Sequence, residues 1–340
     1  MSLAGILDRG EVMKVCRGLT STAVLALLTF APPPLRAQDP QQPDLAPRAT
    51  FKSAVDLVSI AAVVRDQHGR FARDLKQDDF LVLEGKEPRP IVEFHAAQDA
   101  PVRVALLFDV SGSMRLASKM EEARQAARHV LGALRLDNAS MDEAAVFSFD
   151  MNLQALQPFT ADAAAIETAL SRVQPYGQTS LYDAIAQTAR SVAETAPGDR
   201  HRRAVIVFTD GWDTSSEMNP AQVSAIASSI DVPVYVLTIV SPLDHPGGPD
   251  AVTEQRGLPE GKLRTLAHWT GGELFVVSAP AHESIAARQI VDELRHQYVM
   301  AVSASAASRD GWHQLSVRVK NRDLTVRARS GYRAGTRSIS

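Results

Sequence analysis

The alternation of apolar strands with amphipathic helices, over some 200 residues, constrains the fold of this chain most strongly. It begins with "VRVALLFD", residues 102–109, a continuous apolar run typical of a strand that is buried on both faces. The next segment, "SKMEEARQAARHVLGALR", carries apolar residues at helical spacing, and further strands and helices follow in turn. This order predicts an α/β fold with a doubly wound, mainly parallel sheet that helices cover on both faces.

The segments on either side of this core show only β signals. Residues 51–97 contain the strand candidates "VDLVSIAAVVRD", "DDFLVLEGKEPRP" and "IVEFHA", and residues 298–335 contain "YVMAVSA", "WHQLSVRVK" and "DLTVRARSGY". Each flank alone has about three strands and two exposed edges, which is a poor fold by itself. We therefore expect the two flanks to pair as one small all-β domain, with the α/β core of residues 101–297 inserted between them.

The first residues resemble a targeting segment. Basic residues precede the apolar run "LTSTAVLALLTFA", whose length of about 13 residues is below the roughly 20 that a spanning helix needs. Residues 1–37 are thus expected to be a signal peptide cleaved near Ala37, and the mature protein is expected to be secreted or periplasmic. An uncleaved membrane anchor is the alternative, and Met13 is an alternative start. The Pro- and Gln-rich residues 38–50 are expected to form a flexible linker.

Composition excludes several classes of function. The net charge is −3 and no run of Lys and Arg is longer than two, which argues against a nucleic-acid partner. The one cysteine, Cys16, allows no intramolecular disulfide, and neither it nor the nine histidines show the spacing of a zinc site. Contact with a membrane is expected only through an uncleaved signal segment.

Polar side chains follow two of the apolar strands. Asp109 ends the first core strand, Ser111 and Ser113 come next, and Asp210 in "VIVFTDG" ends a later strand in the same way. The carboxyl ends of parallel strands lie at one rim, where ligands collect. Clustered carboxylates and hydroxyls need a compensating cation, and oxygen ligands indicate a hard ion such as Mg²⁺, Ca²⁺ or Mn²⁺. The alternative is that one of the two serines caps the next helix.

These residues resemble the von Willebrand factor A domain family. "DVSGSM" matches its Asp-x-Ser-x-Ser motif, "GQTSLYDAI" places Thr179 at its metal-site threonine, and "FTDG" supplies its second aspartate. The resemblance covers roughly residues 101–297. It implies a Rossmann-like sheet with a metal-ion-dependent adhesion site, in which the serines and Thr179 ligate directly or through water and the aspartates bind directly or hold water ligands. The implied metal residues are Asp109, Ser111, Ser113, Thr179 and Asp210. The flanks resemble a bacterial secreted subgroup found in Acidobacteria.

The resemblance implies a non-enzymatic module for binding, adhesion or assembly. Its divalent ion, Mg²⁺ in the first place and Ca²⁺ or Mn²⁺ as alternatives, would recognise a protein partner that supplies an acidic group; a glycan is a further possibility. The competing hypothesis is a divalent-metal-dependent phosphohydrolase with Asp109 as nucleophile. Against it, Ser111 replaces the second acid of an Asp-x-Asp pair, the sequence marks no partner lysine, and no phosphate-binding motif is present.

The sequence leaves the roles of three further features open. Trp212 either presents an aromatic ring at the site or packs on the adjacent loop. Asp183 is expected to cap or brace the loop that carries Thr179. The Pro- and Gly-rich loop of residues 241–257 lies either near the same rim or in solvent.

Overall fold

The computed structural model describes residues 57–96, 100–136, 142–194, 199, 201–229, 231–240, 259–277, 279–304 and 311–334. The chain divides into the units Met1–Lys52 and Ser53–Ser340, and all described residues belong to the second unit. The expected signal peptide, the linker of residues 38–50 and the loop of residues 241–257 therefore lie outside the described residues. Within those described, no helix combines the length and the apolar character needed to cross a membrane.

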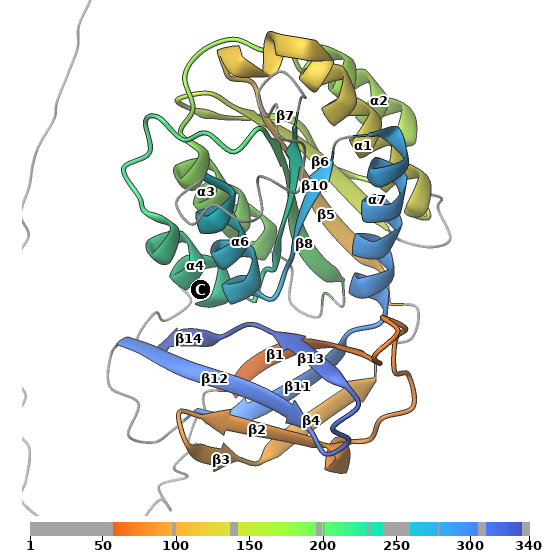
Figure 1. Ribbon diagram of the computed structural model, residues 1–340, viewed down its shortest axis with the longest axis vertical. Coiled ribbons are helices and arrows are strands. Elements are labelled where there is room, and N and C mark those ends of the chain that lie inside the picture. The colour runs from red at the N-terminus through yellow and green to blue at the C-terminus, as the bar shows by residue number, and fades with distance from the viewer. Residues whose placement is uncertain are drawn as a thin grey trace, which may run out of the picture. The chain divides into compact units, whose positions relative to one another are not determined.

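A six-stranded sheet forms the centre of the α/β part (Figure 1). Its strand order is β10-β9-β8-β5-β6-β7, and every pairing in it is parallel except that of β7 with β6. The strands are β5 (Val102–Asp109), β6 (Glu143–Phe149), β7 (Leu153–Thr160), β8 (Arg202–Thr209), β9 (Val234–Ile239) and β10 (Leu274–Val277). The predicted mainly parallel sheet is confirmed.

Helices cover this sheet on both faces, as the alternation predicts (Figure 1). Helices α1, α2 and α7 pack into one apolar core, and α3, α4 and α6 pack into a second core on the opposite face. The helices are α1 (Lys119–Ala133), α2 (Ala163–Arg172), α3 (Leu181–Ala193), α4 (Pro220–Ser229), α6 (Pro259–Thr270) and α7 (Pro280–Arg295). The apolar runs of the inner strands are therefore buried because each strand face meets a helix layer.

The edge strand β7 is absent from the sequence prediction. Its segment "LQALQPFT" contains Pro158 and polar residues, and its burial is only partial. A proline is tolerated in a sheet only where its missing N–H leaves no ladder bond unmade, as at an edge. This weak pattern explains why sequence periodicity does not reveal the strand.

The remaining strands form two four-stranded antiparallel sheets around a third apolar core. One sheet has the order β13-β1-β11-β4 and the other β14-β12-β2-β3, so each contains strands from both flanks of the α/β part. These strands are β1 (Leu57–Arg65), β2 (Phe80–Glu84), β3 (Glu87–Arg89), β4 (Ile91–Ala96), β11 (Tyr298–Ser303), β12 (Gly311–Val319), β13 (Thr325–Ala328) and β14 (Gly331–Ala334). The division into domains at residues 51–97, 101–297 and 298–335 stays a prediction.

The segment "DLTVRARSGY" forms two strands rather than the single strand expected. Strands β13 and β14 belong to different sheets, and Arg329 lies between them. The buried guanidinium of Arg329 donates to the backbone oxygens of Ser228 and Ser59, which draws the chain out of the ladder. A Cβ atom on Gly331 would lie 2.4 Å from the ring of Trp312, so the second strand begins at a glycine that lets this ring approach.

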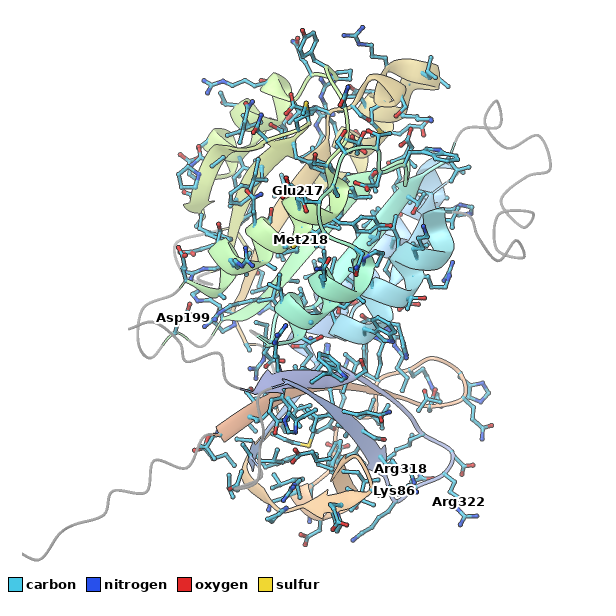
Figure 2. The ribbon with its side chains drawn as sticks, turned by 90° about the vertical axis from the view of Figure 1, so that its left-hand side faces the viewer. Lys86, Asp199, Glu217, Met218, Arg318 and Arg322 are labelled. Atoms are coloured by element: carbon cyan, nitrogen blue, oxygen red, sulfur yellow. The ribbon has the colours of Figure 1, made fainter. Side chains whose placement is uncertain are left out.

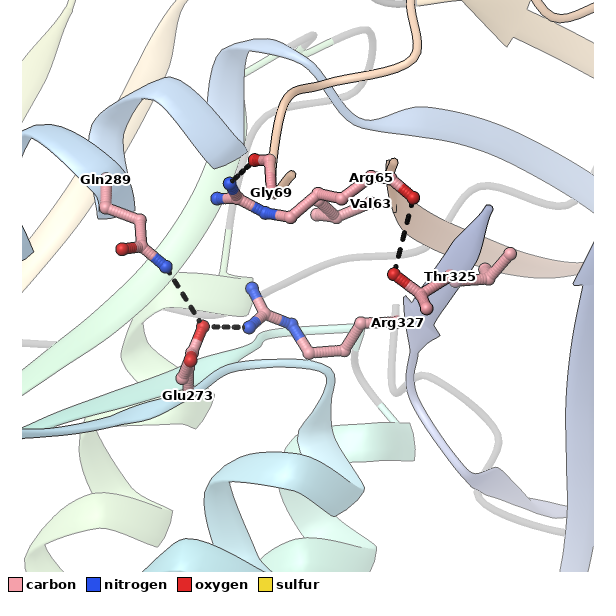
Figure 3. A pocket seen from close by; sticks show the side chains of 8 residues that line it. Val63, Arg65, Gly69, Glu273, Gln289, Thr325 and Arg327 are labelled. Carbon is pink, nitrogen blue, oxygen red and sulfur yellow. Dashed lines mark hydrogen bonds and ion pairs between the residues drawn. The ribbon is translucent and has the colours of Figure 1, made fainter. Parts of the chain in front are cut away.

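A buried carboxylate joins the α/β part to the β sheets. Glu293 of α7 is fully buried, and its Oε1 accepts a hydrogen bond from Arg65 of β1 at 2.7 Å. Its Oε2 accepts from Arg327 of β13, which also reaches Glu273. Figure 3 shows Gln289 donating to that same Glu273, beside a cavity of about 410 Å³. These ion pairs tie strands of the β sheets to helix α7.

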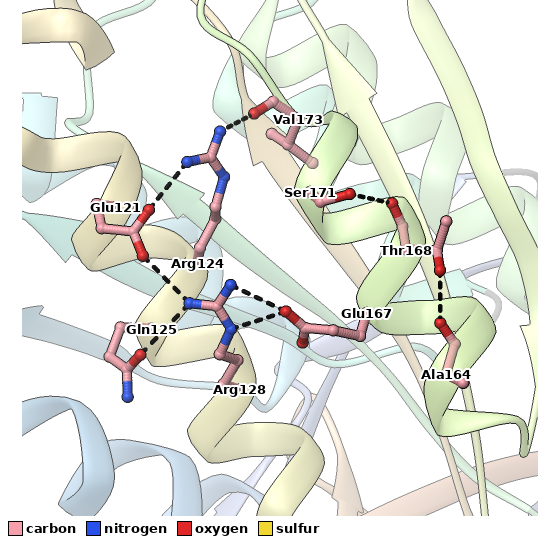
Figure 4. A network of polar contacts seen from close by, with 9 residues as sticks. All are labelled: Glu121, Arg124, Gln125, Arg128, Ala164, Glu167, Thr168, Ser171 and Val173. Atoms are coloured by element: carbon pink, nitrogen blue, oxygen red, sulfur yellow. Dashed lines mark hydrogen bonds and ion pairs between the residues drawn. The ribbon is translucent and has the colours of Figure 1, made fainter.

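Replacing Glu293 is expected to destabilise the protein strongly. Glu293→Ala leaves Arg65 and Arg327 without their buried counter-charge, which costs about 3 kcal/mol of unfolding free energy. Urea denaturation measures this loss. The matched control is Glu121→Ala, because Glu121 pairs with Arg124 and Arg128 on the exposed face of α1 (Figure 4) and should change stability by about 0–1 kcal/mol. Equal effects of the two variants would contradict the buried role of Glu293.

Candidate metal site

Backbone hydrogen bonds bring three loops together at the carboxyl ends of β5 and β8. The amide of Gly112, after β5, donates to the oxygen of Gly177 at 3.0 Å, which ties the first loop to the segment before α3. The oxygen of Thr179 in that segment accepts the amides of Thr214 and Ser215, after β8, both at 3.0 Å. The loops that carry the predicted metal residues therefore meet at one rim of the sheet.

Asp109 is the last residue of β5 and is fully buried. Its Oδ1 accepts the amide of Ser111 at 2.9 Å, and its Oδ2 accepts the hydroxyl of Thr209 at 2.6 Å. Burial raises the pKa of Asp109 to about 7; the negative charge of Asp210 adds to this rise, whereas the hydrogen bond from Thr209 opposes it. A cation nearby would favour the ionised form of Asp109 at neutral pH.

Asp210 directly follows β8 and is also buried. The ammonium of Lys119, the first residue of α1, donates to its Oδ2 at 3.0 Å, and both side chains are 3% exposed. The other oxygen, Oδ1, is buried and has no hydrogen-bond partner among the described residues. A buried acceptor without a donor is costly, so this atom is suited to a cation or an ordered water.

The hydroxyl-bearing residues lie on the loops of the same rim, and Ser111 contacts Asp109. The Oγ atoms of Ser111 and Ser113 are 3.0 Å apart, and Ser111 and Thr179 are each 3% exposed. The alternative that a serine side chain caps the next helix is wrong. Ser111 precedes the 3-10 helix Gly112–Ser118, but its side chain makes no capping hydrogen bond, and the residue at the N-cap of α1 is Ser118.

The donor set fits a hard divalent ion better than zinc. It consists of two carboxylates and three hydroxyls, and Mg²⁺, Ca²⁺ and Mn²⁺ prefer oxygen ligands. In the part of the chain that the structure describes, no group of three or more His, Cys, Asp or Glu side chains is placed to hold a metal. A metal at this rim would therefore depend on hydroxyl ligands and on the unpartnered Oδ1 of Asp210.

Two further aspartates hold the loops in place. The carboxylate of Asp183 accepts the amides of Glu217 at 2.8 Å and Met218 at 2.9 Å, two residues that lie next to each other on the loop after β8 (Figure 2). The expectation that Asp183 caps or braces the loop that carries Thr179 is wrong, because its carboxylate holds the loop after β8 instead. Asp213 accepts the amide of Leu181 at 2.9 Å at the start of α3. Trp212 has an exposed fraction of 51% at the same rim.

Sequence reasoning missed three residues that complete the site. Thr209 directly precedes Asp210, so its place at a strand end is a usable signal for a hydrogen bond across to β5. Asp213 carries a weaker signal, since it stands in a polar loop after a strand. Lys119 carries none, because a lysine at the start of an amphipathic helix looks like an ordinary surface residue.

Residues 104–212 match the family model of the von Willebrand factor type A domain. This match covers about a third of the chain, from within β5 to Trp212, and it includes β6, β7 and β8 together with the loops that carry Ser111, Ser113 and Thr179. Comparison of the sequence with curated proteins gives no match.

Several solved structures are similar to this chain. BatB from Bacteroides thetaiotaomicron, described as a conserved hypothetical protein, is 23% identical, with 56% of this chain and 98% of that chain covered and a TM-score of 0.45. A von Willebrand factor type A protein from Catenulispora acidiphila is 15% identical, with 84% and 76% covered and a TM-score of 0.47. Proximal thread matrix protein 1 from the mussel byssus, described with a zinc-occupied MIDAS motif, is 17% identical, with 62% and 49% covered and a TM-score of 0.45.

Removing the brace at Asp183 is expected to loosen the loop after β8. Asp183→Ala deletes two hydrogen bonds to backbone amides, so hydrogen exchange at Glu217 and Met218 should become about tenfold faster. The matched control is Asp162→Ala, which removes the cap of α2 and should leave these two amides unchanged. Wild-type exchange rates at Glu217 and Met218 in Asp183→Ala would contradict the bracing role.

Proposed function

We propose that the protein is a non-enzymatic binding module that holds a divalent cation at this rim and recognises an acidic group of a protein partner through it. The observation that carries the proposal is the buried Oδ1 of Asp210, which has no hydrogen-bond partner among the described residues and lies at the rim where the loops with the second carboxylate and the three hydroxyl-bearing residues meet. The family of the domain supports a binding role over a catalytic one.

The five predicted residues would hold the ion. Ser111, Ser113 and Thr179 would ligate through their hydroxyls, directly or through water, and Asp109 and Asp210 would supply the negative charge. When bound, the ion would supply a centre of positive charge that attracts a carboxylate from outside. Mg²⁺ is the first candidate for this oxygen set, and Ca²⁺ and Mn²⁺ are alternatives.

The structure removes one argument against the competing hypothesis of a phosphohydrolase and supplies a stronger one. The sequence marks no partner lysine, but in the structure Lys119 pairs with Asp210. However, Asp109 is fully buried, and both of its oxygens accept hydrogen bonds from within the protein. A nucleophile must present a free oxygen to its substrate, so this geometry favours a binding role.

Divalent ions are expected to stabilise the wild-type protein and not Asp109→Asn. The substitution removes one of two negative charges while keeping the shape of the side chain. At a metal concentration of about one hundred times Kd, wild type should gain about 2.7 kcal/mol of unfolding free energy. Melting curves with Mg²⁺, Mn²⁺, Ca²⁺ and chelator measure this gain. In chelator, Asp109→Asn should melt at the wild-type temperature or slightly higher, because a buried charge has been removed.

The control for this experiment is Asp150→Asn. Asp150 is an acid in the turn after β6, where its Oδ1 accepts the amide of Asn152, and it is not among the predicted ligands. It should keep the full stabilisation by metal. Absence of stabilisation of wild type by any of the three ions, together with partner capture from an envelope fraction that chelator leaves unchanged, would refute the metal site. Hydrolysis of p-nitrophenyl phosphate that is lost in Asp109→Asn would replace the proposal by the enzymatic one.

We further propose that the protein acts outside the cytoplasm, in the secreted or periplasmic space. The sequence of residues 1–37 supports this, as does the resemblance of the flanks to a bacterial secreted subgroup. The intact mass of the protein from its native host should correspond to a chain that begins near Gln38. A mass that includes the apolar run of residues 19–30 would indicate an anchor instead.

A further inference from the structure

Lys119 is a buried cation directly beside the candidate metal site. Its ammonium donates to Asp210 Oδ2 at 3.0 Å, and only 3% of its side chain is exposed. Lysine is almost never buried to this degree without a charged partner. Lys119 is also the first residue of α1, where the helix dipole disfavours a positive charge. Its position is therefore explained by Asp210 and not by the helix that carries it.

The backbone before Lys119 adopts a costly conformation. Ala117 and Ser118 have φ values of 49° and 66°, in the left-handed region that residues with a Cβ atom rarely occupy. Each such residue costs about 1–2 kcal/mol. These two residues end the 3-10 segment Gly112–Ser118 and bend the chain into α1, and this bend presents Lys119 to the rim.

The ion pair leaves room for a metal on the same carboxylate. Lys119 contacts Oδ2 of Asp210, whereas Oδ1 is buried and has no partner among the described residues. A cation could therefore bind at Oδ1 while Lys119 stays in place. Asp109 and Asp210 provide two negative charges and Lys119 cancels one of them, so a bound divalent ion would leave this set of charges net positive.

We propose that Lys119 tunes the charge of the site: it weakens the affinity of the rim for the divalent ion and strengthens the attraction of the loaded rim for an external carboxylate. The inference rests on the proposed metal-binding function. Its physical basis is Coulomb's law, because a buried ammonium on a shared carboxylate repels the metal and attracts the partner's acid. Lys119 thus acts as a positioning and specificity residue that need not touch the metal itself.

The test compares Lys119→Met with wild type in two titrations. Calorimetry with MnCl₂ alone should show binding that is about tenfold or more tighter in Lys119→Met. Line broadening of ¹³C-acetate by the protein-bound Mn²⁺, at equal loading, should be several-fold weaker in the variant. In chelator the variant should melt at a lower temperature than wild type, because Asp210 loses its ion pair, whereas saturating Mn²⁺ should reduce or reverse this difference.

Three control variants separate the charge from other effects. Lys119→Arg keeps the positive charge and should retain the Mn²⁺ affinity and acetate broadening of wild type within about threefold. Lys119→Gln removes the charge but keeps a polar side chain, and it serves if Lys119→Met does not fold. Lys86→Met removes an exposed lysine in the turn between β2 and β3 (Figure 2) and should change neither titration.

The outcomes distinguish this inference from the proposed function. If wild type binds Mn²⁺ and the folded, uncharged variant binds it equally well or more weakly, the role proposed for Lys119 is refuted and the metal site stands. If the uncharged variant binds Mn²⁺ more tightly but broadens acetate as much as wild type does, the proposed attraction of the partner's acidic group by Lys119 is refuted. If only the uncharged variant binds Mn²⁺, the role of Lys119 is supported and the function proposed for wild type fails. If neither protein binds Mn²⁺, both fail.

Discussion

The parallel pairing of β5 with β8 is the constraint on which the rest of the site depends. Its register sets Phe108 opposite Phe208, so Asp109 and Thr209 reach the same rim side by side, and Asp210 follows one residue later. Two neighbouring buried carboxylates repel each other and lose their hydration. The hydroxyl of Thr209 and the ammonium of Lys119 each offset part of this cost. The chemistry of the rim follows from a strand register that the apolar runs determine.

Buried carboxylates at the two ends of the α/β part differ in how many of their oxygens are paired within the protein. Where it meets the β sheets, each oxygen of Glu293 accepts a hydrogen bond from an arginine, so the carboxylate is satisfied within the protein. At the opposite rim, Lys119 satisfies one oxygen of Asp210 and leaves the other buried and unpartnered within the described structure. A buried carboxylate whose two oxygens are both ion-paired needs no ligand. One with a single ion-paired oxygen is suited to bind a cation or an ordered water at the other oxygen.

Local sequence patterns predict the sheet, its helices and the acids at its rim, because burial on both faces requires continuous apolar runs that end where the rim begins. They fail where a tertiary contact overrides the local pattern. Strand β7 is weakly apolar and exists because β6 offers it an edge. The break after β13 depends on Arg329 reaching Ser228 in α4. Lys119 meets Asp210 across 91 positions of the chain, and no local periodicity encodes such a pair.

Several local preferences are violated together at this rim. Asp109 is a fully buried carboxyl, Ala117 and Ser118 occupy the left-handed region, and Lys119 places a positive charge at a helix start. Each of these features on its own lowers the free energy of unfolding, by an amount that is a sizeable fraction of the net stability of a domain. They gather around the two acids: Asp109 is one of them, Lys119 pairs with the other, and Ala117 and Ser118 directly precede Lys119 in the chain. When such costs gather where the loops of a parallel sheet converge, binding chemistry explains their arrangement better than stability does.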